Sequence, residues 1–162
     1  MPIDAYIALG SNLGDRELNL LRGVAEIGRL SDSKVTGLSP FYETSPVATT
    51  DPTPFYNAVL RLNTEIPPHD LLHKLLEIET LTFQRIRNEA NGPRRLDLDL
   101  LLYGAAVISE EGIEVPHPRL AERRFVLQPL HDIAPGLVHP KLNKTVATLL
   151  GELRSDETVR PI

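Results

Sequence analysis

Two aspartates, Asp97 and Asp99, stand in an apolar run that follows a cluster of arginines. The run over residues 96–103 has the composition of a strand, with glycine and proline before it and Gly104 after it. Because side chains alternate along a strand, both carboxylates project from one face, about 6.6–7 Å apart along the chain. Two neighbouring carboxylates repel each other unless a cation lies between them. The pair is therefore a candidate site for Mg²⁺ in a protein that handles polyphosphate.

The other face of this strand is expected to be buried, and it would carry Leu96, Leu98, Leu100 and Leu102. One alternative is that the aspartates form the solvated face of an edge strand, as is common in antiparallel sheets. Aspartate is a poor strand former, however, and Leu101 and Tyr103 continue the aspartate face with apolar side chains. A polar pair at one end of a face that becomes apolar favours the floor of a pocket.

Arginines are concentrated on either side of the aspartates. The formal net charge is −5, which argues against a general nucleic-acid binder. Arginine offers forked donors suited to phosphate oxygens and keeps its charge, so the group indicates a small, highly charged anion, although any single member could be only solvated. Two short segments hold seven of the 17 basic residues: Arg85, Arg87, Arg94, Arg95, Arg119, Arg123 and Arg124.

Glu79 and His117 are two further candidates. Glu79 falls in the apolar sector of the helix expected over residues 69–83, where a carboxylate needs a cation or a hydrogen-bond donor. It either pairs with an arginine as part of the structure or faces the aspartate cleft, where it would hold a nucleotide group or a metal-bound water. His117 lies between two prolines that hold the backbone extended, which favours a phosphate contact over a turn residue.

The length of 162 residues predicts a single domain over residues 1–162. The chain contains no cysteine, which excludes disulfides and thiolate chemistry and is compatible with the cytoplasm. No signal peptide and no stretch as long as a membrane span are evident. We expect a cytoplasmic protein, monomeric, that binds neither membrane nor nucleic acid.

The expected elements follow the order β-α-β-β-α-β. This order predicts an α+β, ferredoxin-like antiparallel sheet with helices packed on it and a C-terminal extension. In the helix over residues 15–30, Leu18 and Leu21 are expected on the apolar side, and Gly10 to Gly14 is expected to be only a turn. The extension would hold a hairpin, a His-Pro loop and a helix over 145–153. The expected strands cover residues 5–9, 34–38 with 41–44, 57–63 and 96–103.

Several motifs resemble one enzyme family along residues 6–150. They are Tyr6 to Gly14, Phe41 to Val47, Phe55 to Val59, Gly92-Pro93-Arg94-Arg95-Leu96-Asp97-Leu98-Asp99 and Val115 to Arg119 with Arg123 to Leu127. They are similar to those of the 6-hydroxymethyl-7,8-dihydropterin pyrophosphokinases of folate biosynthesis. The resemblance implies a ferredoxin-like fold and transfer of pyrophosphate from ATP to the pterin hydroxymethyl group, which leaves AMP.

The resemblance also implies roles for individual residues. Asp97 and Asp99 would hold two Mg²⁺ ions. Phosphates would be contacted by Arg94, Arg123 and His117, with Arg85 and Arg87 supplied by a lid loop. The pterin would meet backbone groups of Thr44 and Val47 and the side chain of Asn57, with Phe55 and Phe125 on its two faces.

Some positions depart from the family pattern: Asn91 stands where many relatives have tryptophan, and the spacing before Arg85 differs. One alternative is another two-metal nucleotide-processing enzyme on a ferredoxin-like fold, which would need no aromatic pterin pocket. Another is an RNA-recognition module, which would need a basic sheet face with exposed aromatics.

Overall fold

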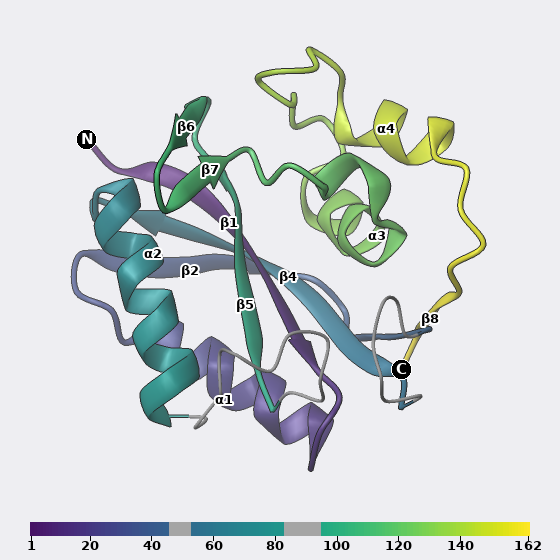
Figure 1. Cartoon of the computed structure of the whole chain (residues 1–162), viewed down its shortest axis with the longest axis horizontal. Coiled ribbons are helices and arrows are strands. Elements are labelled where there is room, and N and C mark those ends of the chain that lie inside the picture. The colour runs from purple at the N-terminus through teal and green to yellow at the C-terminus, as the bar shows by residue number, and fades with distance from the viewer. Residues whose placement is uncertain (46–52, 83–94) are drawn as a thin grey trace.

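The structure, a computed structural model, describes residues 1–45, 53–82 and 95–162. Its centre is an antiparallel sheet in the order β5-β1-β4-β3-β8, with β2 also paired to β4 (Figure 1). The strands are β1 (Ile3–Ser11), β2 (Ser33–Leu38), β3 (Tyr42–Thr44), β4 (Phe55–Thr64), β5 (Asp97–Tyr103) and β8 (Val159–Pro161). The β-α-β-β-α-β order confirms the ferredoxin-like prediction, with β2 and β3 separated near Pro40 and both paired to the same side of β4.

One face of the sheet is covered by α1 (Arg16–Gly28) and α2 (Pro68–Glu77), which continues as a π-helical turn over Ile78–Thr82. The buried side chains of α1 are Asn19, Leu20 and Ile27, with Gly23 against the sheet. The expectation for Leu18 and Leu21 is wrong, because both are 48% exposed. The helix approaches so closely at Gly23 that a Cβ there would lie 3.0 Å from Leu96 Cδ2, and this contact sets the inward face.

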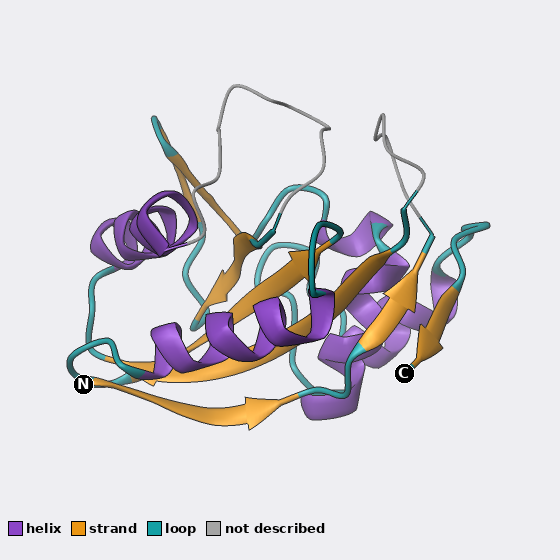
Figure 2. Ribbon diagram, turned by 90° about the horizontal axis from the view of Figure 1, so that it is seen from below, coloured by secondary structure: helices purple, strands orange, loops and turns teal. Residues whose placement is uncertain are grey.

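The other face is covered by α3 (Arg124–Ile133) and α4 (Val146–Glu152). Val126, Leu127 and Leu130 of α3 pack with Val146 and Leu149 of α4 in a second core. The helix over 145–153 is confirmed, whereas α3 was not foreseen. Figure 2 shows helices on both sides of the strands. None of the helices in the described ranges is both long enough and apolar enough to cross a bilayer.

Between β5 and α3 the chain forms a two-stranded hairpin, β6 (Ile108–Glu110) and β7 (Ile113–Val115), followed by a 3₁₀ turn over Leu120–Glu122. The hairpin confirms the expected extension. A cis peptide bond joins Val115 to Pro116.

A β-bulge in β5 alters the expected alternation. The register with β1 shifts between Tyr6, opposite Leu102, and Ile7, opposite Leu100, so Leu101 is the extra residue. Leu98 and Leu100 pack in the first core, whereas Leu101 and Leu102 both pack in the second. The prediction that Leu102 shares a face with Leu96, Leu98 and Leu100 is therefore wrong.

Candidate active site

The floor of the site is a row of three residues across adjacent strands. Gly10 of β1 lies opposite Asp97 of β5 on one side and opposite Asn57 of β4 on the other. Two residues earlier in β1, Ala8 lies opposite Asp99 on one side and opposite Val59 on the other. Ala8 and Val59 belong to the core beneath α3. The two aspartates and Asn57 therefore share the sheet face that α3 covers.

Gly10 keeps this floor open. A Cβ at this position would lie 2.9 Å from Asn57 Nδ2 and 3.4 Å from Phe55 Cδ1. The expectation that residues 10–14 form only a turn is wrong in part, because Gly10 and Ser11 belong to β1 and are buried. The missing side chain leaves space between the acidic pair and the Asn57 amide.

One half of the site is built from β3, β4 and the start of α3. The Thr44 hydroxyl donates to Asn57 Oδ1 at 2.5 Å, and both side chains are buried. Phe55 and Phe125 are half-buried, the first beside Gly10 and the second 5.5 Å from the Arg123 guanidinium carbon, measured to the ring centroid. The structure thus brings Thr44, Phe55, Asn57 and Phe125 to the aspartate face.

This half is tied to α3 by Tyr42, whose hydroxyl donates to Asp132. Burial raises the pKa of Tyr42 to about 12, and the Asp132 carboxylate adds to the shift. Tyr42 is therefore a neutral donor at any ordinary pH, and it fixes β3 against the helix that carries Phe125.

His117 lies on the other side of the aspartates from the half built by β3 and β4. It is fixed through its backbone and its ring. Its N–H donates to the Leu101 carbonyl at 2.9 Å, and its Nδ1 accepts from the Arg119 N–H at 3.2 Å. Burial lowers the pKa of His117 to about 4, with further lowering by Arg123 and Arg119 against the opposite effect of Asp97. The neutral ring then carries its proton on Nε2, which leaves an N–H donor for an anion.

Arg123 lies among charges of both signs. Burial lowers the pKa of its guanidinium, Asp99 raises it, Arg119 lowers it, and Asp97 and Glu157 raise it. Arginine keeps its charge throughout. A half-buried cation whose charge interacts with two carboxylates and with His117 is suited to a phosphate.

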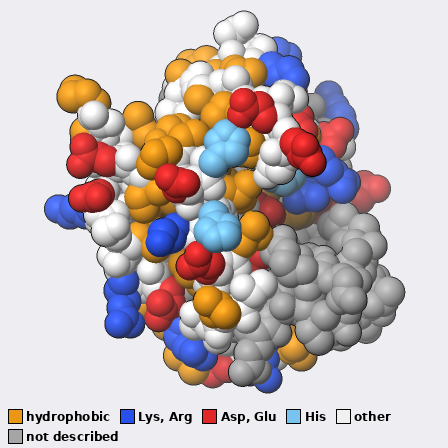
Figure 3. Space-filling model, turned by 60° about the vertical axis from the view of Figure 1, so that its left-hand side comes forward, with side chains coloured by type: hydrophobic (Ala, Val, Ile, Leu, Met, Phe, Trp, Pro, Cys, Tyr) orange, Lys and Arg blue, Asp and Glu red, His pale blue; other side chains and the backbone are white. Residues whose placement is uncertain are grey.

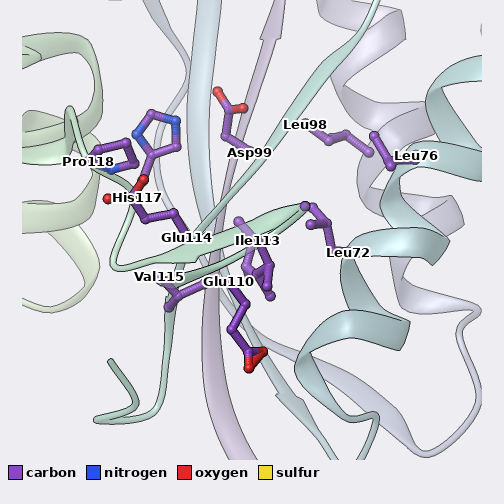
Figure 4. A pocket seen from close by; sticks show the side chains of 12 residues that line it. Leu72, Leu76, Leu98, Asp99, Glu110, Ile113, Glu114, Val115, His117 and Pro118 are labelled. Atoms are coloured by element: carbon purple, nitrogen blue, oxygen red, sulfur yellow. The ribbon is translucent and has the colours of Figure 1, made fainter. Parts of the chain in front are cut away.

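A cavity of about 410 Å³ opens between α2 and the β6–β7 hairpin. Figure 4 shows Asp99 and His117 at one end of it and Glu110 at the other. Its apolar walls are Leu72, Leu76, Leu98, Ile113 and Val115. No residue pattern in the sequence predicted this cavity, because it forms between elements that are far apart along the chain.

Glu79 is fully buried in the π-helical turn, as its place in the apolar sector indicated. Its Oε2 accepts from the Leu98 N–H at 2.6 Å, between the two aspartates. Because β5 is the edge strand, that N–H points away from β1 and needs an acceptor from outside the sheet. Contact of Glu79 with a nucleotide stays a prediction.

Four predicted site residues, Val47, Arg85, Arg87 and Arg94, lie outside the described residues. Within the described ranges, no cluster of three or more His, Asp or Glu side chains could hold a metal by itself. On the face shown in Figure 3, Lys and Arg side chains are interspersed with Asp and Glu.

The ferredoxin-like sheet places the paired carboxylates beside a cavity of about 410 Å³ and near a cluster of polar and aromatic side chains, an arrangement suited to phosphoryl transfer between two bound molecules. Residues 6–135 match the family described as 7,8-dihydro-6-hydroxymethylpterin-pyrophosphokinase (HPPK). The chain belongs to this family, which confirms the resemblance seen in its motifs.

Two bacterial relatives are named 2-amino-4-hydroxy-6-hydroxymethyldihydropteridine pyrophosphokinase. The protein of Bacillus subtilis is 44% identical over 129 residues, which cover 80% of this chain and 77% of that protein. The protein of Methylorubrum extorquens is 41% identical over 134 residues, which cover 83% of this chain and 84% of that protein.

Longer relatives also match. Folic acid synthesis protein FOL1 of Dictyostelium discoideum is 39% identical over 140 residues, or 86% of this chain but only 21% of that protein. This chain therefore spans about a fifth of the length of such proteins. A solved structure of Plasmodium falciparum HPPK-DHPS has a TM-score of 0.76 at 15% identity and covers 94% of this chain and 44% of that one, which supports the fold alone.

Proposed function

We propose that this protein transfers the pyrophosphoryl group of ATP to the hydroxymethyl group of 6-hydroxymethyl-7,8-dihydropterin and releases AMP, as a step of folate biosynthesis. One observation carries the proposal: Asp99 lines a cavity large enough for a nucleotide base, and Asp97 lies across Gly10 from Asn57, on the same sheet face as Thr44 and Phe55. Family membership agrees with this activity.

The ATP half would use the cavity between α2 and the hairpin. Its leucine and isoleucine walls suit a flat purine, which buries apolar surface there. A base in this cavity would direct its phosphates toward Asp99 and His117, which line the cavity, and on to Arg123 beyond them. The His117 Nε2–H and the Arg123 guanidinium would then donate to phosphate oxygens.

HPPK enzymes work with ATP and Mg²⁺. Mg²⁺ is commonly bound by one or two carboxylates together with substrate phosphates and waters. A half-buried carboxylate pair is therefore a fitting donor set, even though the described residues offer no cluster of three ligands. We propose that Asp97 and Asp99 hold two Mg²⁺ ions together with ATP. The ions would neutralise charge on the triphosphate.

The pterin half needs groups that recognise a flat, polar heterocycle. Phe55 and Phe125 would stack on its faces, and Asn57 would pair with its amide-like edge while Thr44 fixes the Asn57 amide. The open floor at Gly10 would let the ring approach the sheet backbone.

The reaction would proceed in line without a covalent enzyme intermediate. The pterin hydroxyl oxygen bonds to the β-phosphorus, the bond from the β-phosphorus to the bridging oxygen of AMP breaks, and the hydroxyl proton leaves to solvent. No general base is assigned. Arg123 and His117 would stabilise charge on the β-phosphate oxygens, and the two binding halves would align the hydroxyl with the phosphorus.

The roles of Val47, Arg85, Arg87 and Arg94 belong to this proposal and derive from the family resemblance. Arg94, Arg85 and Arg87 would add phosphate donors, and Val47 would contact the pterin through its backbone. A cytoplasmic location and a monomeric state stay predictions from the sequence.

The test combines calorimetry with AMP formation. A non-hydrolysable MgATP analogue and the pterin are each expected to bind more tightly in the presence of the other, and AMP is expected to form only when both substrates are present. Turnover of ATP without the pterin would favour another two-metal enzyme, and strong RNA binding without nucleotide affinity would favour an RNA-recognition module.

Asp97→Asn and Asp99→Asn should each reduce AMP formation by about 100-fold or more while leaving the fold intact. Asp4→Asn is a matched control, because Asp4 is an exposed aspartate on the same sheet whose carboxylate accepts from Asn63 Nδ2 at 3.1 Å. Near-normal turnover in either aspartate variant would contradict the site.

A further inference from the structure

Arg16, the first residue of α1, contacts both β3 and the start of β4. The first turn of the helix is fixed because the Asp15 side chain accepts from the Leu18 N–H at 3.1 Å. The Arg16 side chain is only 24% exposed, so most of it is covered by the protein. A guanidinium that is covered to this extent needs partners for its N–H groups and for its charge.

The guanidinium contacts the residues on either side of Phe55. Its Nη1 donates to the Pro54 carbonyl at 2.8 Å. Its central carbon lies 3.9 Å from the centroid of the Tyr56 ring, which is a cation–π contact. Pro54 and Tyr56 are the sequence neighbours of Phe55. Arg16 therefore holds the chain immediately before and immediately after this phenylalanine.

The same side chain also reaches β3. Arg16 Nη1 lies 3.8 Å from Glu43 Oε2, and Glu43 is opposite Tyr56 in the pairing of β3 with β4. The other carboxylate oxygen of Glu43, Oε1, lies 2.9 Å from Arg160 Nη2 of β8. A carboxylate between two arginines thus links α1, β3 and β8.

These contacts are made from behind the pterin half of the site. Tyr56 packs against the first core, and Glu43 opposite it shares that face of the sheet. Because side chains alternate along a strand, their neighbours Phe55 and Thr44 lie on the other face, toward the aspartates. Phe55 and Thr44 form the last cross-strand pair of β3 with β4, and the end of a strand ladder opens most easily. Arg16 stabilises the sheet at this end.

We propose that Arg16 is a positioning residue for the pterin: from the opposite face of the sheet, its guanidinium fixes the backbone on both sides of Phe55 and so holds the ring on which the pterin stacks. This inference rests on the proposed function, because Phe55 must contact the pterin. It extends the pterin half of the site to the first turn of α1, on the other face of the sheet.

The test compares Arg16→Gln with Arg29→Gln at the other end of the same helix. Arg29 is the C-cap residue of α1, with a side chain that is 78% exposed and paired with Glu26 at 3.4 Å, so both changes remove one positive charge. Arg16→Gln is expected to raise KM for the pterin about tenfold with little change in KM for ATP, and Arg29→Gln to change neither. Arg16→Lys keeps the charge without the planar fork and should show a smaller rise, which preserves the comparison if Arg16→Gln is unfolded. Thermal unfolding checks that each variant is folded.

A double-mutant cycle with Phe55→Ala separates positioning from a general structural effect. If Arg16 acts through Phe55, Arg16→Gln causes no further rise in KM for the pterin in the Phe55→Ala background. Additive rises, equal rises in both KM values, or an Arg16→Gln enzyme equal to the Arg29→Gln control would overturn the proposal. Normal pterin binding by Phe55→Ala would instead contradict the pterin pocket of the proposed function.

Discussion

At the scale of single residues, the site depends on the absence of a side chain at Gly10. An alanine Cβ would lie 2.9 Å from Asn57 Nδ2, a distance at which the amide must shift. We expect Gly10→Ala to raise KM for the pterin about tenfold or more, with little change in KM for ATP, because the cavity between α2 and the hairpin is untouched.

Steady-state kinetics with each substrate varied in turn measure this difference. Gly28→Ala is the control, since a Cβ there would lie 3.7 Å from Val35 Cγ2, an ordinary contact. Equal increases in both KM values would show that Gly10 does not belong to the pterin half.

The His117 ring makes a prediction about pH. Burial lowers its pKa to about 4, whereas the unfolded chain takes up this proton near the ordinary value of 6.5. The free energy of unfolding should therefore fall as pH is lowered from 6.5 toward 4, by about 1 kcal/mol from this residue after solvent screening. His117→Asn should remove that part of the slope.

Urea unfolding of both proteins at several pH values measures the difference. His139 also has a lowered pKa through burial, so the wild-type slope alone does not isolate His117, and only the difference between the two proteins does. Parallel slopes would mean that His117 titrates normally in the folded protein.

Residue types and spacing predicted the acidic pair and the buried glutamate because their chemistry is local. A pair of aspartates two positions apart on a strand shares a face whatever the rest of the chain does. Leu102 is the exception to this alternation, because the bulge at Leu101 moves it to the other core. A bulge depends on pairing with β1, which the sequence of β5 alone does not specify. Gly10 lies against Asn57 of a distant strand, so its contact could not be predicted from the local sequence.

At the scale of elements, the π-helical turn and the aspartate strand form one unit through Glu79. Glu79→Ala would leave the buried Leu98 N–H without this acceptor, and we expect a loss of about 2–4 kcal/mol in the free energy of unfolding. Glu79→Gln keeps an acceptor oxygen and should cost less.

Urea unfolding measures both losses, and AMP formation shows whether Asp97 and Asp99 keep their positions. Glu77→Ala is the control on the same helix, since its carboxylate lies 3.1 Å from His73 on the exposed side. If Glu79→Ala is as stable as this control, Glu79 does not hold the strand.

Helix α3 shows why element prediction failed in the C-terminal part. Pro129 lies inside the helix and lacks an N–H, which is a signal against helix in sequence reasoning. The helix forms nevertheless because Val126, Leu127 and Leu130 are buried against the sheet, and their burial outweighs the missing hydrogen bond. Tertiary packing of this kind cannot be inferred from a window of ten residues.

At the scale of the whole molecule, the two helical layers share one sheet. The first core lies under α1 and α2 and the second under α3 and α4, while β1, β4 and β5 contribute residues to both. The site lies where the second layer meets the sheet, with its cavity reaching α2 of the first. The ferredoxin-like half was predictable from the order of its elements. The covering of the second face of the sheet was not predictable, because it depends on α3, which the sequence did not indicate.

This shared sheet predicts that residues 1–162 unfold as a single domain. Leu71→Ala opens the first core and Leu130→Ala the second, and each residue is fully buried. Each change should cost about 2–5 kcal/mol. Because both cores depend on the same strands, each variant should shift one common urea transition, seen alike by circular dichroism and tyrosine fluorescence. If Leu130→Ala instead produced a separate early transition, with the first core still folded, the α3–α4 layer would be an independent unit, and the site would be assembled between two parts of different stability.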